Sequence, residues 1–256
     1  MTERTSGGER LTISREGFAQ PAARGTAVAR ATLMRVAAGE LPATFRLHHP
    51  PRLLAFSKQD AASPGFRRAV AVAREGGFEP VIRLAGGRAA VYHEETLAVS
   101  WAVPDRRPSA RTEERFRELA ELLAESLRDL GVQARVGEVP GEYCPGAWSV
   151  NARGATKLVG TGQRLIAGAS HRGGVVVVRN SVAVREPLIG VYEALGLDWD
   201  PATAGSIEDE VTGATVEGAA EAILARLGEH YDLREAPVDP ETLALAQRLE
   251  SDHSVE

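Results

Sequence analysis

The sequence predicts an α+β fold, a single domain with a central, mostly antiparallel or mixed sheet and flanking helices. Short apolar segments cluster over residues 80–103 and 148–178 with few residues between them, which favours hairpins over repeated βαβ units. Residues 111–130 have helical periodicity, and the chain from residue 188 onward is also helical in pattern. Neither a repeat of fixed period nor a low-complexity linker divides the 256 residues, so we expect one domain.

Six helices are expected from periodicity and from their end signals. The first is rich in alanine and is ended by Gly39 and Pro42, and the second stops at Gly76. The clearest has apolar residues at i, i+3, i+4 and i+7, two glutamates in its first turn and Gly131 directly after it. The predicted helices are residues 21–38, 65–75, 111–130, 188–195, 214–227 and 241–249.

Ten short strands are expected between these helices. The first two flank Pro50 and Pro51 and are predicted to pair around a turn. In the segment 97–103 the large residues alternate with small ones such as Ala98 and Ser100, so one face is large and apolar and the other is small. The predicted strands are residues 44–48, 52–56, 80–84, 89–92, 97–103, 132–136, 148–151, 156–159, 163–166 and 174–178.

The two ends of the chain lack strong periodicity. Residues 1–18 are polar and are predicted to be a loose tail, residues 19–236 to form the domain, and residues 237–256 to form a C-terminal helix and tail that is frayed over 251–256. The N-terminus has no apolar stretch of the kind found in signal peptides, and no apolar run approaches the roughly 20 residues of a membrane helix. We therefore expect a cytoplasmic protein without a membrane partner.

Charge and cysteine content exclude several classes of site. With 30 basic and 35 acidic residues the net charge is −5, so a dominant nucleic-acid surface is not expected. One cysteine excludes an internal disulfide framework and a multi-cysteine zinc site. The sequence also lacks the short metal-binding, nucleotide-binding and hydrolase motifs, and no metal site is predicted.

The first segment with chemical potential runs from Arg83 to His93. Gly86 and Gly87 separate two predicted strands, so the backbone there could approach a ligand closely and direct N–H groups at an anion or a carbonyl oxygen. Arg83 and Arg88 bracket the turn and could hold a carboxylate or phosphate. The alternative is an ordinary hairpin turn with solvated arginines.

Two further segments carry a candidate nucleophile and a candidate lysine. Cys144 lies in a Pro/Gly-rich loop, where a substrate could reach it, although a lone cysteine is often a small buried spectator. Lys157, one of only two lysines, opens a short apolar strand that runs into Gly160 and Gly162. Its alternative is an edge-strand lysine in solvent. His171 is a weaker candidate, with an ordinary turn histidine as its alternative.

Together, in this order, the three segments resemble the biotin/lipoate A/B protein ligase family. Lipoate-protein ligase A carries an Arg-Arg-x-Ser-Gly-Gly-Gly-Ala-Val-x-His stretch, which Arg83-Leu-Ala-Gly-Gly-Arg-Ala-Ala-Val-Tyr-His93 resembles. The family's Gly-x-Lys-(Ile/Phe)-x-Gly-x-(Ala/Ser)-Gln is similar to residues 154–163, with one residue inserted before Lys157. The resemblance covers roughly residues 20–230 and implies the biotin/lipoate ligase catalytic fold, which is similar to that of class II synthetases.

Within this family, the sequence is most similar to cysteine-dependent octanoyltransferases and lipoate-protein ligase A-like proteins. Arg88 replaces the third glycine of the ligase motif, and Tyr-Cys-Pro-Gly precedes the lysine strand, as in those proteins. Ala85 stands where the family has Ser or Thr, and Leu84 replaces the second arginine. The resemblance implies Cys144 and Lys157 as catalytic residues. The substrate-binding residues that it implies are Arg83, Gly86, Gly87, Arg88, Ala90, Val91, Tyr92, His93, Gly160, Gln163 and His171.

The function that the resemblance implies is acyl transfer in protein lipoylation. Cys144 would take an octanoyl or lipoyl group from a thioester carrier, Lys157 would hydrogen-bond the acyl carbonyl, and an acceptor lysine would then receive the group. Val91, Leu158 and Val159 would line the acyl tunnel, and His93 and Gln163 would shape its mouth. Arg83, Arg88 and Arg164 would attract an acidic acceptor domain.

The implied partners are proteins that carry the acyl group. The donor would be an acyl carrier protein or another octanoyl- or lipoyl-loaded protein, and the acceptor a lipoyl domain of a 2-oxoacid dehydrogenase or the glycine cleavage H protein.

The transferase needs no cofactor. The first alternative is an ATP-dependent lipoate-protein ligase, which would need ATP and Mg²⁺ and form a lipoyl-AMP intermediate with Cys144 as a bystander. The second is a non-catalytic acyl-binding homologue.

Overall fold

An eight-stranded mixed sheet forms the centre of the protein in the computed structural model, which describes residues 9–256. Its strand order is β11-β1-β2-β6-β10-β9-β8-β7. Strand β1 pairs in parallel with β2 and β11, and every pair from β2 to β7 is antiparallel. The strands are β1 (Glu9–Ser14), β2 (Thr44–His48), β6 (Thr96–Asp105), β7 (Ala134–Val136), β8 (Val150–Ala152), β9 (Thr156–Ile166), β10 (Gly168–Val177) and β11 (Tyr231–Glu235).

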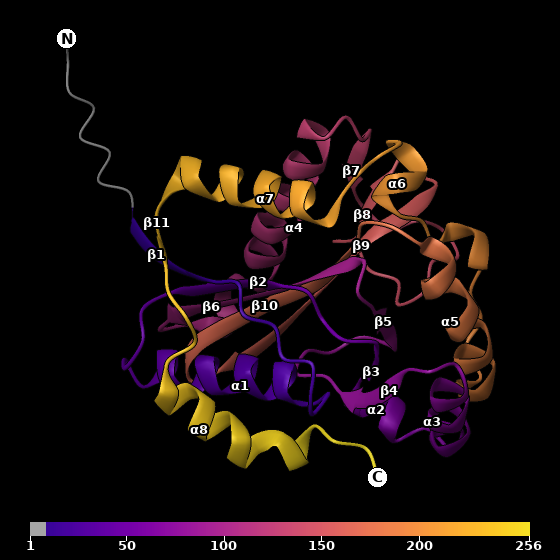
Figure 1. Ribbon diagram of the computed structural model, residues 1–256, viewed down its shortest axis with the longest axis horizontal. Helices are drawn as coiled ribbons and strands as arrows, with labels where there is room; N and C mark the ends of the chain where they lie inside the picture. Colours follow the sequence, from indigo (N-terminus) through magenta and orange to yellow (C-terminus); the bar gives the residue numbers. More distant parts are fainter. Residues whose placement is uncertain (1–8) are drawn as a thin grey trace.

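Helices cover both faces of this sheet, which confirms the predicted α+β class. Figure 1 shows α4 and α7 on one side of the sheet, α1 with α8 on the other, and α3 and α5 near the smaller strands β3–β5. All six predicted helices are present, together with two single-turn helices, α2 and α6. The helices are α1 (Arg24–Ala37), α2 (Lys58–Ala61), α3 (Phe66–Glu75), α4 (Thr112–Asp129), α5 (Ser181–Leu195), α6 (Ile207–Glu210), α7 (Val216–His230) and α8 (Pro240–Leu249).

The two faces of the large sheet differ in the size of their side chains. On β6, Leu97 and Trp101 belong to the largest buried cluster, between the sheet and helices α4 and α7. Ala98 and Ser100 alternate with them and point to the opposite face, as the sequence pattern predicted. Small side chains and glycines on that second face leave space between the sheet and α1.

A second sheet of three strands, in the order β4-β3-β5, lies across this space. Its strands are β3 (Leu53–Phe56), β4 (Glu79–Ile82) and β5 (Ala90–Tyr92). The predicted pairing of residues 44–48 with 52–56 is wrong, because β2 belongs to the large sheet and β3 to the small one. Pro50 and Pro51 between them lack backbone N–H groups and cannot donate to a tight hairpin ladder.

Both ends of the described chain are more ordered than predicted. Residues 9–14 form β1, with Leu11 and Ile13 buried, so the predicted tail is wrong there, while residues 1–8 lie outside the described part. Strand β11 was not predicted. The expected fraying of residues 251–256 is also wrong, because His253 is buried and its carbonyl accepts a 2.9 Å hydrogen bond from the Ile82 N–H. Neither terminal segment has the periodicity that reveals such long-range pairing.

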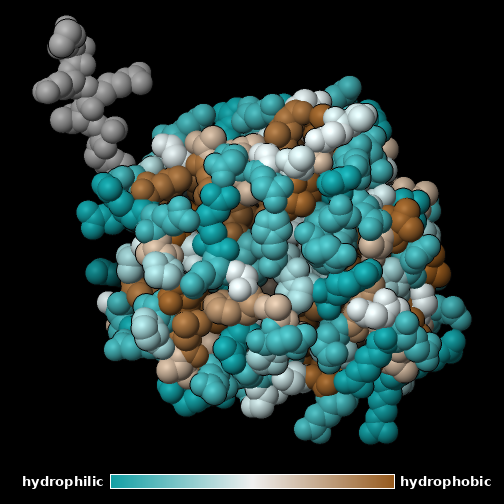
Figure 2. Space-filling view, viewed as in Figure 1, coloured by the Kyte–Doolittle hydropathy of each residue, from teal (hydrophilic) through white to brown (hydrophobic). Residues whose placement is uncertain are grey.

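The predicted strands 156–159 and 163–166 are one continuous strand, β9. Gly160 and Gly162, between the two predicted segments, pair with Val175 and Gly173 of β10 and remain in the ladder. On the face seen in Figure 2, hydrophilic residues cover most of the surface and hydrophobic ones form small separate groups. Over residues 9–256, none of the helices has the length and apolar character needed to cross a bilayer.

Candidate active site

Cys144 occupies a strained position in the loop between β7 and β8. Its φ is +44°, in the left-handed region that non-glycine residues rarely adopt. Its N–H donates a 2.9 Å hydrogen bond to the Tyr192 hydroxyl on α5, which in turn donates to the Ala89 carbonyl at 3.1 Å. One buried tyrosine thus connects the cysteine loop to the segment that enters β5.

The Gly86–Gly87 turn brings backbone and guanidinium groups to the sulfur of Cys144. The Arg88 N–H donates to Sγ at 3.0 Å, and Arg83 Nη2 lies 3.7 Å from it. Gly87 has φ +100°, and a Cβ there would lie 2.8 Å from Sγ, so only glycine fits without a shift. A donated N–H and a nearby cation both interact favourably with negative charge on sulfur.

The side chain of Arg88 anchors the same turn from the other side. Its Nη1 lies 3.3 Å from the carboxylate of Asp60, which is fully buried and also caps α2 through Ser57. The sequence predicted that Arg88 holds a ligand. In the structure its side chain pairs with Asp60, so it also holds the glycine turn in place. Arg83 likewise donates to the Gly86 carbonyl.

Lys157 is 1% exposed, which excludes the edge-strand lysine in solvent. Its Nζ donates to the Cys144 carbonyl at 2.8 Å, the Tyr143 carbonyl at 2.9 Å and Glu142 Oε1 at 3.0 Å. An ammonium group has three donors, so all of them are used inside the protein. The pairing of β9 with β8 skips Leu158, and this bulge places Lys157 on the same sheet face as Gly160.

Glu142 is the functional-site residue that the sequence analysis missed. It is buried, and its carboxylate accepts hydrogen bonds from the Val139 N–H, the Gly146 N–H, the Ser149 hydroxyl and Lys157. These contacts fold the cysteine loop around one carboxylate. The sequence gives only a weak signal of this role, an acid two residues before a cysteine in a Pro/Gly-rich loop. Its lysine partner follows 15 residues later, on β9.

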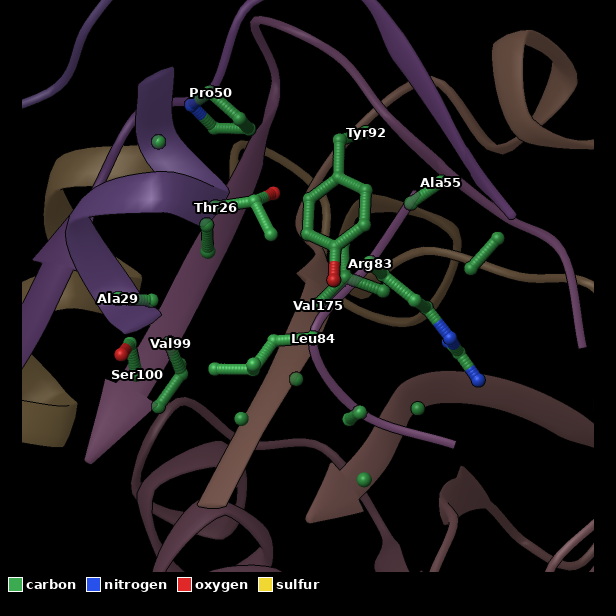
Figure 3. A pocket seen from close by; sticks show the side chains of 18 of the residues that line it. Thr26, Ala29, Pro50, Ala55, Arg83, Leu84, Tyr92, Val99, Ser100 and Val175 are labelled. Carbon is green, nitrogen blue, oxygen red and sulfur yellow. The ribbon is translucent and has the colours of Figure 1, made fainter. Parts of the chain in front are cut away.

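The main cavity opens beside Cys144 and extends over the small-residue face of the large sheet. It contains about 930 Å³ of space, its open mouth included. Figure 3 shows Arg83 and Ser100 on opposite sides of this cavity, with Leu84 and Tyr92 between them. Its floor crosses β9, β10, β6 and β2, and its other walls come from the start of α1 and from β3 and β5.

Several predicted binding residues line this cavity and others do not. Ala90, Tyr92, Gly160 and His171 line it together with Arg83, Cys144 and Lys157. The prediction that Val91, Leu158 and Val159 line an acyl tunnel is wrong, because their side chains lie in the two large apolar cores. Strand alternation turns Val91 away from its neighbours Ala90 and Tyr92.

His93 and Gln163 occupy different surroundings from those predicted. His93 is fully buried behind the cavity, where its Nδ1 accepts from the Glu95 N–H at 3.2 Å and burial lowers the pKa of its ring. It shapes the turn before β6 rather than the mouth of the cavity. Gln163 lines a separate groove and donates to the Thr112 carbonyl at 3.1 Å.

This separate groove, called the outer groove below, also borders Cys144. Its walls include Gly87, Phe116, Trp148 and Gln163. The Phe116 and Trp148 rings stack with their centroids 6.4 Å apart, and the Arg117 guanidinium lies 5.6 Å from the Trp148 ring. Cys144 therefore borders both the main cavity and the outer groove.

Within residues 9–256, no three or more His, Cys, Asp or Glu side chains lie together in a way that could hold a metal ion. The arrangement instead offers a thiol with an N–H and a guanidinium beside it, and a cavity behind it. Such a set can carry out covalent transfer of a group that fits the cavity.

Several known transferases are similar to this chain in sequence. An octanoyl-[GcvH]:protein N-octanoyltransferase of Geobacillus kaustophilus is 30% identical over 166 residues, covering 63% of this chain and 56% of the relative. One of Anoxybacillus flavithermus is 34% identical over 144 residues, covering 56% and 49%. The chain thus spans about half the length of the curated relatives it matches.

Solved structures share the fold. Lipoate-protein ligase A bound with ATP superposes with a TM-score of 0.75 at 17% identity, covering 95% of this chain and 94% of the ligase. The bipartite lipoate protein ligase of Thermoplasma acidophilum gives 0.71 at 17% identity, covering 95% and 92%. Residues 21–228 match the family described as the lipoyl protein ligase A/B catalytic domain. The chain therefore belongs to the lipoyl protein ligase A/B catalytic domain family.

Proposed function

We propose that this protein is an acyltransferase that moves an octanoyl or lipoyl group to a lysine of a lipoyl-carrier domain through a thioester on Cys144. The observation that carries the proposal is the place of Sγ. It borders both the main cavity and the outer groove, 3.0 Å from the Arg88 N–H and 3.7 Å from the Arg83 guanidinium. The acyl chain would occupy the cavity, and the donor and acceptor would approach through the groove.

The reaction has two balanced steps. In the first, the Cys144 thiolate attacks the carbonyl carbon of the donor thioester. A new carbon–sulfur bond forms, the donor's carbon–sulfur bond breaks, and the donor leaves as a thiol with the proton that Cys144 lost. In the second, the neutral amine of the acceptor lysine attacks the same carbon. The amide forms, the bond to Cys144 breaks, and the amine proton returns to the sulfur.

The structure suggests a role for Lys157 that differs from the one implied by the resemblance. The sequence analysis assigned its ammonium to the acyl carbonyl, but all three donors already bind Glu142, Tyr143 and Cys144. We therefore propose that Lys157 is first a positioning residue, which holds the carbonyl of Cys144 and thus the direction of its side chain. Contact with an acyl carbonyl requires one of the three bonds to be exchanged.

The proposed acceptor is a lipoyl domain or a glycine cleavage H protein, and the proposed donor a carrier loaded with an octanoyl or lipoyl group. The names of the similar transferases include GcvH, and one of the similar structures contains a lipoate protein ligase with its E2 lipoyl domain. Arg164 is exposed on β9 and Arg117 borders the outer groove, so both can attract an acidic partner. The transferase would need no cofactor, and its cytoplasmic location stays a prediction.

The test is to incubate the purified chain with octanoyl-loaded acyl carrier protein in the absence of ATP and to record the intact mass. We expect one octanoyl adduct on the wild-type chain, sensitive to hydroxylamine, and none on Cys144→Ser. A control is Ser251→Ala, an exposed serine near the C-terminus, which leaves the cysteine loop unchanged. Addition of a lipoyl domain should then discharge the adduct.

A different outcome would reject the proposal. If no adduct forms, and free lipoate is attached to the lipoyl domain only after ATP and Mg²⁺ are added, the protein is a ligase. The fold shared with ATP-bound lipoate-protein ligase A makes this arm of the experiment necessary. Acyl binding without transfer under either condition would identify a non-catalytic homologue.

A further inference from the structure

The wall of the main cavity farthest from Cys144 is polar. It is formed by Arg46 and His48 on β2, Ser100 on β6 and His171 on β10, all at most 8% exposed, and is called the polar end below. None of the four has a role in the mechanism above. A cavity built for a purely hydrocarbon chain would have apolar side chains at its closed end, because buried polar groups without partners are costly.

Arg46 is the charged group of the polar end. Its Nε donates to the Glu16 carbonyl at 2.8 Å and its Nη1 to the Gly25 carbonyl at 3.1 Å, while the Phe18 ring lies 5.1 Å away. The residue is only 4% exposed, yet its Nη2 has no hydrogen-bond partner within residues 9–256. Burial lowers the pKa of Arg46 to about 9, so it is still a cation at neutral pH.

Arg46 has no carboxylate of residues 9–256 in direct contact, although the charge of Glu16 acts on it through space and partly offsets the lowering of its pKa. Over the described residues no carboxylate forms a salt bridge with it, and its two bound partners are neutral carbonyl oxygens. The first turn of α1, with Gly25 and Thr26, borders the same region, and a helix N-terminus adds partial positive charge. Figure 3 shows Thr26 and Ala29 on the same side of the cavity as Ser100.

The two histidines add neutral hydrogen-bonding groups. His171 Nε2 lies 3.0 Å from the Ser100 hydroxyl, and burial lowers the pKa of His171 to about 4 and that of His48 well below its usual value. In each ring Nδ1 has no partner in the described part of the chain. The polar end therefore has one net positive charge and several groups able to meet an oxygen-bearing ligand.

The register of the sheet places this end at the distance of a medium-length chain from the nucleophile. Arg46 pairs with Ser100, Ser100 with Gly173, and Gly173 with Gly162, so one row crosses four strands. Three strand spacings amount to roughly 14 Å. The neighbouring row contains Ala98 and Val175, which form a small, apolar floor between the two ends.

We propose that the polar end binds the far end of the acyl chain when that end carries oxygen, with a terminal carboxylate fitting best and a hydroxyl second. The carboxylate would accept from Arg46 Nη2 and neutralise its charge, and Ser100 and His171 would bind its second oxygen. The apolar middle would hold the methylene chain. This inference rests on the proposed function only for the attachment of the other end at Cys144.

The test measures binding apart from transfer. The probes are N-acetylcysteamine thioesters of octanoate, of 8-hydroxyoctanoate and of the half-acid of octanedioate, and affinity is measured by calorimetry on the full chain with Cys144→Ser. We expect the carboxylate-ended probe to bind at least about ten-fold more tightly than the methyl-ended one, with the hydroxyl between them. Adding Arg46→Met should remove this preference, and adding Arg226→Met, a surface control, should not.

Arg46 also ties Glu16 and Gly25 together, so its variant could lose structure. Ser100→Ala is the second variant and should reduce the ratio of carboxylate to octanoyl affinity about three-fold, as expected for the loss of one hydrogen bond. If the octanoyl probe binds the Cys144→Ser chain as tightly as the carboxylate-ended probe, or more tightly, the inference is overturned. Adduct formation on the wild-type chain is recorded separately. Preferential binding without any adduct rejects the proposed function alone, and adducts without preferential binding reject the inference alone.

Discussion

The two ends of the main cavity are both polar, but they use their polar groups differently. Beside Cys144, Lys157 and Glu142 are bonded to each other and to the loop, so the charges of this pair are matched within the protein. At the polar end, Arg46 is a cation without a salt bridge to any described residue, and the two histidine rings are held neutral by burial. The bonds beside Cys144 hold the cysteine loop in one conformation, whereas the polar end has hydrogen-bond donors available to a ligand that enters the cavity.

This difference predicts opposite responses to substitution. Where each group already has its partners, removal of one partner leaves the other buried and unpaired, so the main effect is on stability. Where partners are lacking, substitution at neutral pH changes binding more than stability, and the effect on stability appears at low pH. The three predictions below are ordered by the size of the expected effect.

The largest effect is expected for Glu142→Gln. The neutral amide leaves the Lys157 ammonium, which is 1% exposed, without its counter-charge, and breaking a buried pair costs about 3–5 kcal/mol. Urea unfolding of the variant and the wild-type chain measures this difference. The double variant Glu142→Gln/Lys157→Met should recover part of the loss because the buried charge is gone. A loss under about 1 kcal/mol would show that the pair does not hold the loop.

The polar end predicts a dependence of stability on pH. Burial, and next the charge of Arg172, lowers the pKa of His171 to about 4, so the unfolded chain binds a proton between pH 6.5 and 4 that the folded chain does not. Stability therefore falls as the pH is lowered through this window, by about 3 kcal/mol from this ring. Unfolding free energies of the wild type and His171→Asn at pH 7, 5.5 and 4 measure the effect. Identical losses in the two proteins would contradict it.

The smallest effect is expected for Tyr192→Phe. Loss of the hydroxyl leaves the Cys144 N–H and the Ala89 carbonyl without their partner, which costs about 1–2 kcal/mol. The rate of adduct formation should fall while the affinity of the Cys144→Ser chain for the octanoyl probe is unchanged by the same substitution. Tyr231→Phe is the matched control, since among residues 9–256 its hydroxyl bonds only Glu118, at 3.4 Å and near the surface. If both substitutions lower the rate of adduct formation equally, Tyr192 does not connect the cysteine loop to β5 in the way proposed.

Local patterns in the sequence were enough to predict much of the fold. The helix over residues 111–130 is α4 almost to the residue, because its apolar stripe, its first-turn glutamates and Gly131 act within a few residues of one another. The strand ending at Val103 alternates large and small residues, and this alternation predicted its two faces, although Val99 of the large face also borders the cavity. The cysteine loop, the glycine turn and the lysine strand were also recognisable as a set.

Patterns that depend on distant partners were not predictable. Strand β1 contains only two buried apolar residues and exists because β2 and β11 pair with it from positions far along the chain. The assignment of Val91 and Leu158 to the cavity failed because spacing along a strand does not say which face the rest of the fold covers, and the bulge in β9 shifts that face at Lys157.

The sequence by itself thus determined the fold class, the family and the residues that could react, since periodicity, end signals and motifs are properties of neighbouring residues. Only the tertiary structure decided what these residues are bonded to. It committed all three donors of Lys157 to the cysteine loop, brought Glu142 into the site, and collected Arg46, His48, Ser100 and His171 from three strands at one end of a cavity. Hydrogen bonds and burial join residues that are close in space, and that closeness arises only when the sheet has formed.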